Sequence, residues 1–276
     1  MCIGRKRLRQ LQRLTAPLML RRTMNDAVIS AQMPPKIESL VFCKPSPLQQ
    51  DLYKALLSSA ETQKSLASNK PGGVFAVIAR VIKLLNHPTL LLRQDEESGA
   101  QSRQEDDDGV TDLTLGAAAG RAVAVDMAFV KTHFPVDYKQ HSLVHSGKLE
   151  VLFELLKSVK ASCSDRFVLV SNYTTTLDLL EVLCKEAAYS FLRLDGSVTS
   201  DKRRDVVASF NKPQSDVFVF LLSSLAGGVG LNLVGANRLV LIDPSWNPAH
   251  DLQAMARVWR FGQTKQCHIY RLLTSG

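Results

Sequence analysis

Three polar side chains late in the sequence have the spacing of a phosphate-binding helix face. Gln253, Arg257 and Arg260 lie in residues 247–260, which are expected to form a helix. At about 100° per residue, offsets of four and seven place the Arg257 and Arg260 side chains within about 40° of that of Gln253. Two permanently charged guanidiniums suit a polyphosphate whose charge grows during phosphoryl transfer. The alternative is a ladder of surface ion pairs, but no acidic residue follows Asp251.

A glycine cluster at 227–230 fits neither common phosphate-loop pattern. The dinucleotide pattern GxGxxG fails because Leu233 stands where Gly228 and Gly230 require a third glycine. The P-loop pattern fails because Gly147-Lys148 is followed by leucine instead of Ser or Thr. The cluster is therefore either a phosphate contact or a plain tight turn, and the sequence lacks its own triphosphate-binding loop.

Small polar residues follow the expected strands in the second half of the sequence. In a parallel sheet, the carboxyl ends of strands meet the N-termini of helices, whose free N–H groups attract ligands. The residues in these positions include Asn172, Tyr173, Gly196, Ser197, Ser223, Ser224 and Asp243.

The elements that position these residues alternate regularly after residue 141. Apolar runs predict strands at 167–171, 191–194, 217–222, 238–242 and 268–273. Amphipathic patterns predict helices at 148–159, 174–187, 199–210 and 247–260. Wholly apolar strands separated by helices are typical of a parallel sheet covered on both faces. We therefore predict one doubly wound α/β domain over 141–276.

The first 140 residues predict a different organisation. Helices are expected at 5–30, from Pro47 to Leu57 and at 74–85, with a strand at 37–44. Residues 46–93 thus form a helical subdomain. Residues 94–140 are acidic, then rich in Gly and Ala, and are interpreted as an insertion and linker.

Composition and charge exclude several classes of protein. The chain has 276 residues, is 45% hydrophobic and carries a net charge of +8, which excludes disorder throughout. Residues 1–22 hold seven basic residues and no acid. This segment either contacts phosphates or is the outer face of a helix packed through its leucines. Those leucines are Leu8, Leu11, Leu14 and Leu18.

Membrane and metal sites are not predicted. No apolar run reaches the roughly 18 residues that a membrane span requires. Five cysteines without a CxxC pair exclude a zinc ribbon and favour a reducing compartment. His141 and His145 have metal-pair spacing, but no Glu lies between them, so we expect no metal site.

Ordered blocks of the sequence resemble the C-terminal motor lobe of the Swi/Snf-type DNA-dependent ATPases, a branch of the two-lobed helicase superfamily. The blocks are 20–23, 33–38, 49–53, 84–88, 167–173, 192–197, 222–233, 237–248 and 253–263. Residues 164–179 and 267–273 are similar to the recombination-repair branch, the Rad-fifty-four translocases. The resemblance implies a RecA-like lobe at 141–276. It also implies that residues 1–45 are the tail of a missing first lobe, with strand 37–44 in that lobe's sheet.

The resemblance also implies roles for individual residues. Arg257 and Arg260 would be arginine fingers. Contacts with the nucleotide would come from Gln253, Gly228, Gly230 and Asn232. Contacts with the phosphates of one DNA strand would come from Asn172, Tyr173, Gly196, Ser197, Ser223 and Ser224.

The implied cofactor is ATP with Mg²⁺, bound mainly by the first lobe, so this chain alone is expected to be inactive. The implied partners are double-stranded DNA and a recombinase filament or nucleosomes, in the nucleus. Leu225, Ser245 and Phe261 depart from the family pattern, and Leu225 removes a basic phosphate contact.

Three functions remain open at this point. The first is the C-terminal half of an ATP-dependent DNA translocase or remodeller in homologous-recombination repair. The second is a non-hydrolysing DNA- or protein-binding module with the same fold. The third is an RNA helicase lobe or an unrelated nucleotide-binding enzyme, against which Trp246-Asn247-Pro248 and residues 49–53 argue.

Overall fold

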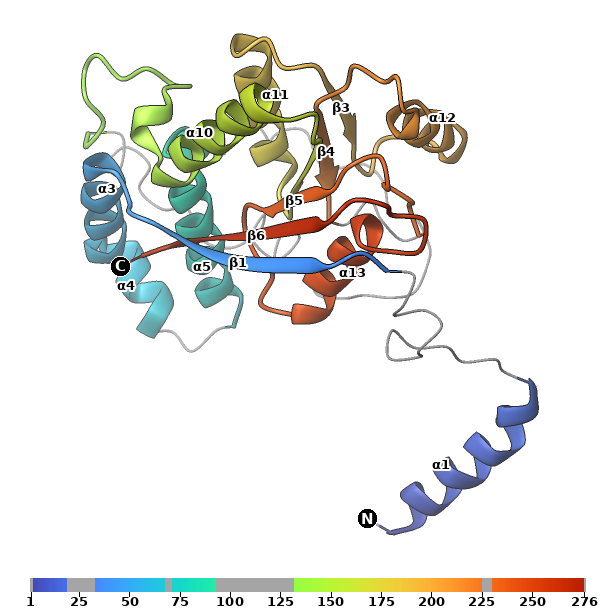
Figure 1. The fold of residues 1–276 in the computed structure, drawn as a ribbon. Helices are drawn as coiled ribbons and strands as arrows, with labels where there is room; N and C mark the ends of the chain where they lie inside the picture. Colours follow the sequence, from blue (N-terminus) through green and yellow to red (C-terminus); the bar gives the residue numbers. More distant parts are fainter. Residues whose placement is uncertain (1, 19–32, 68–70, 93–131, 225–229, 276) are drawn as a thin grey trace.

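A six-stranded parallel sheet forms the centre of the protein (Figure 1). The computed structural model describes residues 2–18, 33–67, 71–92, 132–224 and 230–275. The strand order is β1-β6-β5-β2-β4-β3, and each neighbouring pair runs parallel. The strands are β1 (Lys36–Cys43), β2 (Phe167–Ser171), β3 (Phe191–Leu194), β4 (Val219–Ser223), β5 (Arg238–Leu241) and β6 (Cys267–Thr274).

Helices cover both faces of this sheet, which confirms the predicted doubly wound fold. They are α10 (Gly147–Ser162), α11 (Thr174–Glu186), α12 (Ser200–Asn211) and α13 (Pro248–Val258). Successive residues of a strand point to opposite faces. Leu169 of β2 accordingly joins a core with α10 and α11, whereas Val170 joins a second core with α12 and α13. Each fully buried apolar side chain of this kind contributes roughly 1.5–3 kcal/mol.

Strand β1 belongs to this sheet, which corrects the expectation that strand 37–44 lies in the sheet of a missing lobe. Its register with β6 runs from Lys36 opposite Cys267 to Cys43 opposite Thr274. β6 already pairs with β5 on one side, so its other edge has unpaired backbone groups that β1 satisfies. β1 then forms the outer edge of the sheet and leaves Phe42 largely exposed.

Four helices follow β1 in the sequence, and the first, third and fourth of them share a small core. They are α3 (Pro47–Ser58), α4 (Ala60–Ala67), α5 (Pro71–Asn86) and α6 (Thr89–Leu92). Ser46 caps α3 by accepting from the Gln49 backbone N–H, and the Gln49 side chain accepts in return from the Ser46 backbone. The core consists of Leu52, Leu56, Leu84 and Leu91. We keep 46–93 as a proposed helical subdomain.

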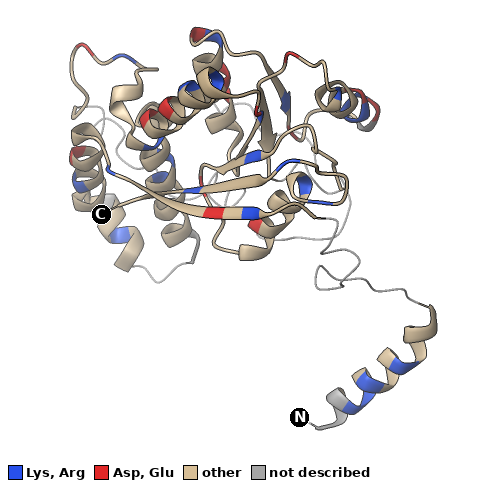
Figure 2. Cartoon of the chain, in the orientation of Figure 1, with Lys and Arg blue, Asp and Glu red and all other residues tan. Residues whose placement is uncertain are grey.

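The basic segment forms a helix, α1 (Cys2–Thr15), followed by the 3-10 turn η1 (Ala16–Leu18). Figure 2 shows the basic residues along α1, which contains no acid. Leu8, Leu11, Leu14 and Leu18 are 55% to 84% exposed, so the described residues do not show the alternative in which these leucines pack inward. The rest of the helix predicted to reach residue 30 lies outside the described residues, as does the block at 20–23.

Only the end of the predicted 94–140 insertion is described, and it packs on the helical subdomain. The Tyr138 hydroxyl lies 2.7 Å from Thr89 Oγ1, and the Phe134 ring packs edge-on against Tyr138. The 3-10 turn η2 (Leu143–His145) then leads into α10. Within the described part of the chain, no helix has the length and apolar character to cross a membrane.

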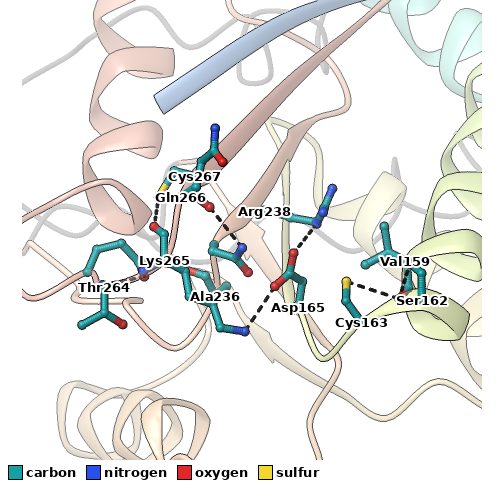
Figure 3. A network of polar contacts seen from close by, with 12 residues as sticks. Val159, Ser162, Cys163, Asp165, Ala236, Arg238, Thr264, Lys265, Gln266 and Cys267 are labelled. Atoms are coloured by element: carbon teal, nitrogen blue, oxygen red, sulfur yellow. Dashed lines mark hydrogen bonds and ion pairs between the residues drawn. The ribbon is translucent and has the colours of Figure 1, made fainter. Parts of the chain in front are cut away.

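An ion cluster closes the amino edge of the sheet (Figure 3). Arg238 Nε donates to Asp165 Oδ2 at 2.8 Å, and Lys265 Nζ donates to Oδ1 at 3.2 Å. Burial alone would raise the pKa of Asp165, but hydrogen bonds from Asn237, Arg238 and Lys265 together lower it to about 2. Asp165 therefore stabilises the fold in its charged form.

We expect Asp165→Asn to lower the free energy of unfolding by about 1 kcal/mol at pH 7. A carboxyl whose pKa is lowered by folding stabilises above its unfolded pKa, near 4, and loses that contribution as the pH falls toward 2. Denaturation at several pH values should thus show the difference from wild type shrinking between pH about 4 and about 2. Asp216→Asn, at an exposed residue on the same edge, is the control. A difference that stays constant down to pH 2 would contradict this account.

Candidate functional site

The carboxyl ends of β2, β4 and β5 meet around one buried carboxylate, that of Asp243. Its Oδ1 accepts from the Asn172 backbone N–H at 3.0 Å, and its Oδ2 accepts from Ser171 Oγ at 2.8 Å. The Asn172 side chain donates to the Asp243 backbone carbonyl at 2.6 Å and accepts from Ser224 Oγ at 2.5 Å. Asn172 is thus held by its backbone and by both ends of its amide.

Burial dominates the electrostatics of Asp243, which is 5% exposed. Burial raises the pKa of Asp243 to about 6, against the opposing effect of bonds from Asn172, Ser171 and Asn86 and the charge of Lys148. Burial likewise lowers the pKa of Lys148, and the charge of Asp243 raises it. Two buried groups of opposite charge therefore lie behind this edge.

The predicted DNA contacts differ in exposure. Gly196 and Ser197 are exposed, and Asp195 Oδ1 accepts from both the backbone N–H and the hydroxyl of Ser197. Asn172, Tyr173 and Ser224 are half-buried. Ser223 is only 2% exposed, so its side chain does not reach the surface in this structure.

Lys83 adds a positive charge to this edge, because its Nζ lies 5.9 Å from the centre of the Tyr173 ring. Hydroxyl, amide and backbone N–H donors at fixed positions suit contact with phosphate oxygens. Such contacts hold any base sequence equally, since phosphates carry no sequence information. The edge can therefore bind a nucleic-acid strand by its backbone.

The arginine pair is placed differently from the expected single helix face. Arg257 lies in the last turn of α13 and is 6% exposed, whereas Gln253 is exposed. Arg260 lies beyond the helix, which ends at Val258 with Trp259 as its C-cap. The expectation that all three share one helix face is therefore wrong for Arg260. The chain turns at Gly262, whose φ of +96° favours glycine.

Contacts nevertheless bring both arginines to the loop before β5. Arg260 Nη1 donates to the Leu231 carbonyl at 3.1 Å, and the Leu233 N–H donates to the Arg257 carbonyl at 2.9 Å. Burial lowers the pKa of Arg257, and the charge of Arg260 lowers it further. The positive charges of the two guanidiniums thus repel each other.

Gly230 and Asn232, two of the predicted nucleotide contacts, belong to this same loop and are exposed. Asn211 Nδ2 donates to the backbone carbonyl of Asn232 at 2.7 Å, and this bond does not involve the Asn232 side chain. Gly228 and Leu225 lie outside the described residues.

The two groups of candidate residues lie at opposite ends of the parallel strands, one at the amino ends and one at the carboxyl ends. Helix α13 begins after the carboxyl end of β5, and at its other end Trp259 Nε1 donates to the carbonyl of Pro34, two residues before β1. The arginines therefore lie toward the amino edge, away from Asn172 and Ser224 at the carboxyl edge. Any phosphate chemistry at the arginines is thus separate from contacts made at the carboxyl edge.

The described residues fit ATP phosphates better than they fit Mg²⁺. Two guanidiniums and the loop at 230–233 provide donors for phosphate oxygens. Within the described ranges, no group of three His, Cys, Asp or Glu residues could hold a metal ion.

The sequence does not predict the interior network behind the carboxyl edge. Lys148 appears there only in the failed P-loop pattern, and Asn86 only in the block at 84–88. The available signal was a lysine directly before a mostly apolar run, residues 149–156. Its partners Asn86 and Ile242 are distant in sequence, so no spacing pattern could identify them.

Comparison with known proteins gives two family matches. Residues 147–262 match the helicase conserved C-terminal domain, and residues 3–90 match the SNF2-related domain. The human DNA repair and recombination protein RAD54-like is 44% identical over 277 residues, 99% of this chain and 34% of that protein.

Two solved structures share the fold. The C-terminal part of the Fun30 ATPase domain has a TM-score of 0.60 and 26% identity, covering 88% of this chain and 86% of that one. The SWI2/SNF2 ATPase core of Sulfolobus solfataricus in complex with dsDNA has a TM-score of 0.59 and 22% identity, covering 97% of this chain and 47% of that one.

These matches define a RecA-like C-terminal helicase lobe. Within the helicases, the chain is similar to the Swi/Snf family through its SNF2-related residues 3–90, and to the RAD54 proteins over nearly its whole length, which confirms the resemblance predicted from the sequence. It spans about a third of the length of the curated relatives it matches.

Proposed function

We propose that this chain is the C-terminal half of an ATP-dependent translocase or remodeller of double-stranded DNA in homologous-recombination repair. The observation that carries the proposal is the carboxyl edge, where Asp243 fixes Asn172 and, through it, Ser224. A motor that moves along DNA must hold every sequence, and fixed donors to phosphates meet that need. The similarity to RAD54-like proteins supports repair as the setting.

DNA contact is assigned to the exposed and half-buried residues of this edge. The Gly196 N–H, the second Nδ2 hydrogen of Asn172 and the Tyr173 hydroxyl would donate to phosphates along one strand. Ser197 and Ser224 would donate to phosphates by turning away the hydroxyls that now donate to Asp195 and Asn172. Ser223, being buried, would act only through its neighbours. A recombinase filament or nucleosomes remain the proposed further partners, and the nucleus the proposed location.

ATP would contact the loop and arginines at the other edge. Arg257 and Arg260 would stabilise charge on the transferred phosphate, with Gln253, Gly228, Gly230 and Asn232 beside the nucleotide. Hydrolysis of bound ATP with Mg²⁺ would supply the free energy that drives movement. Because the sequence lacks a P-loop, a first motor lobe would hold most of the nucleotide, and this chain alone would be inactive.

One observation favours the second candidate, a non-hydrolysing binding module. Arg257 is buried and Arg260 already donates to the Leu231 carbonyl, as expected of arginines that only hold the loop in place. This candidate predicts DNA binding without any role for the arginines in turnover.

The experiment for DNA binding measures affinity for duplexes of different sequence as a function of salt. We expect weak binding without sequence preference, falling steeply between about 50 and 200 mM salt because each neutralised phosphate releases counterions. Ser197→Ala with Ser224→Ala should weaken binding without changing the salt slope, since neither side chain is charged.

The basic helix α1 requires its own control. Replacing Arg7, Arg9 and Arg13 with glutamine removes three exposed charges there. If the carboxyl edge binds DNA, the serine changes should still weaken binding in this background. Salt-independent affinity, a strong sequence preference, or serine changes without effect would refute the proposed interface.

A further inference from the structure

A chain of hydrogen bonds leads from a buried ammonium group to the proposed DNA-contact edge. Lys148, in the first turn of α10, is 6% exposed. Its Nζ donates to the Ile242 carbonyl at 2.9 Å and to Asn86 Oδ1 at 3.2 Å. Moving an ammonium out of water costs several kcal/mol even after relaxation. Lys148 is therefore kept only because these acceptors and the nearby charge of Asp243 offset that cost.

The ammonium fixes the orientation of the Asn86 amide. A lysine ammonium only donates, so the oxygen of the amide must face Lys148 and its nitrogen must face away. Asn86 Nδ2 accordingly donates to Asp243 Oδ2 at 3.1 Å and to Thr176 Oγ1 at 3.3 Å. The Asp243 carboxylate only accepts and therefore requires the same orientation, so the ammonium and the carboxylate hold the Asn86 amide from its two ends.

Asp243 passes this constraint to the surface. Its Oδ2 accepts hydrogen bonds from Asn86 Nδ2 and Ser171 Oγ, and its Oδ1 accepts one from the backbone N–H of Asn172. The Asn172 amide in turn receives the Ser224 hydroxyl. These hydrogen bonds thus connect helices α5 and α10 to the residues that follow strands β2, β4 and β5. The connected residues are Lys148, Asn86, Asp243, Asn172 and Ser224.

We propose that Lys148 is a positioning residue for DNA binding, which orders Asn172 and Ser224 through Asn86 and Asp243 without touching DNA. The inference rests on the proposed function of the carboxyl edge and extends it to the interior. It also links the helical subdomain, whose helix α5 ends at Asn86, to the DNA-contact residues.

The test is Lys148→Met, which keeps the apolar stem and removes the ammonium. Lys157→Met is the matched control, because this lysine is on the same helix with its side chain 74% exposed. In Lys148→Met, we expect the Asn172 amide to exchange hydrogen about tenfold faster relative to the Leu169 amide, and duplex affinity to fall about tenfold. The slope of affinity against salt should stay unchanged, because no phosphate contact is lost.

Several outcomes would overturn the proposal. A salt slope smaller by about one would mean that Lys148 itself contacts a phosphate. Unchanged exchange at Asn172, or an affinity equal to that of Lys157→Met, would mean that Lys148 only supports the fold. If wild type fails to bind DNA, the proposed function fails, whereas hydrogen exchange still decides whether Lys148 orders Asn172.

A second variant covers the case in which Lys148→Met does not fold. Lys148→Met with Asp243→Asn removes both buried charges together and leaves no isolated charge in the interior. We expect this variant to fold with the same faster exchange at Asn172 and weaker DNA binding. Wild-type exchange and affinity in the double variant would refute the positioning role.

Discussion

Replacing Arg257 or Arg260 with alanine is expected to lower ATP turnover by about 10³- to 10⁵-fold in a two-lobe protein that joins this chain to a first motor lobe. The guanidinium stabilises charge that develops mainly in the transition state, so nucleotide and DNA binding should change little. Lysine at either position should not restore turnover, because a point charge cannot reproduce the planar fork of donors. Turnover, nucleotide affinity and melting temperature are measured on the same variants.

The contacts of the arginines make a structural explanation testable in the same experiment. If the pair only holds the loop at 230–233 through the Arg260 bond to Leu231, alanine should lower the melting temperature and lysine should largely restore turnover. Arg166→Ala is the matched control, because Arg166 Nη1 also donates to a backbone carbonyl, that of Phe210, at 2.6 Å. It should lower melting temperature alone. Turnover restored by lysine, or lost only in proportion to lost fold, would remove the arginine-finger assignment.

Gly147→Ala is expected to destabilise the fold by about 3 kcal/mol or more. A Cβ at Gly147 would lie 1.8 Å from the Lys44 carbonyl oxygen and 2.9 Å from its carbon, so backbone would have to move. That backbone is constrained by β1 on one side and by the Ser46 cap of α3 on the other. Urea denaturation should show a lower midpoint with an unchanged dependence on denaturant.

Gly196→Ala provides the comparison for this effect. A Cβ at Gly196 would meet nothing within 4 Å, so its free energy of unfolding should stay within about 0.5 kcal/mol of wild type. Equal midpoints for the two variants would show that α10 can move away from Lys44 at little cost.

Most of the sheet could be predicted because its central strands, β5, β2 and β4, are largely apolar. β2 and β3 occupy the predicted ranges 167–171 and 191–194, since a buried parallel strand needs apolar residues toward both faces. The partner of β1 could not be predicted. Cys267 lies about 230 residues after Lys36, and nothing local in either strand specifies the other.

The helix predicted at 247–260 extends two residues beyond the observed end of α13 at Val258, although the sequence contains a signal for the end of a helix. Gly262 stands shortly after the last residue of α13, a common position for glycine after a helix. Leu8, Leu11 and Leu14 of α1 show the opposite limit, because their spacing predicts a helix but cannot say whether a packing partner is present.

The candidate site was predictable at its surface and not behind it. Strand ends identified Asn172 and Ser197 because the carboxyl edge of a parallel sheet is fixed by topology. The interior bonds of Lys148 join residues 62 and 94 positions apart, which only the folded structure brings together. The exposure of Ser223 could not be inferred from its neighbours in sequence.

The pairing of β1 with β6 sets a waiting time during synthesis. At about 5–20 residues per second, a ribosome needs roughly 10–50 s to pass from β1 to its partner strand. For that interval β1, with Leu40 and Phe42 uncovered, has no ladder to join, and β5, once made, lacks its outer neighbour until β6 follows. A nascent chain paused before residue 267 thus exposes an unpaired sheet edge and an unpaired strand with apolar side chains. Chaperones bind surfaces of this kind.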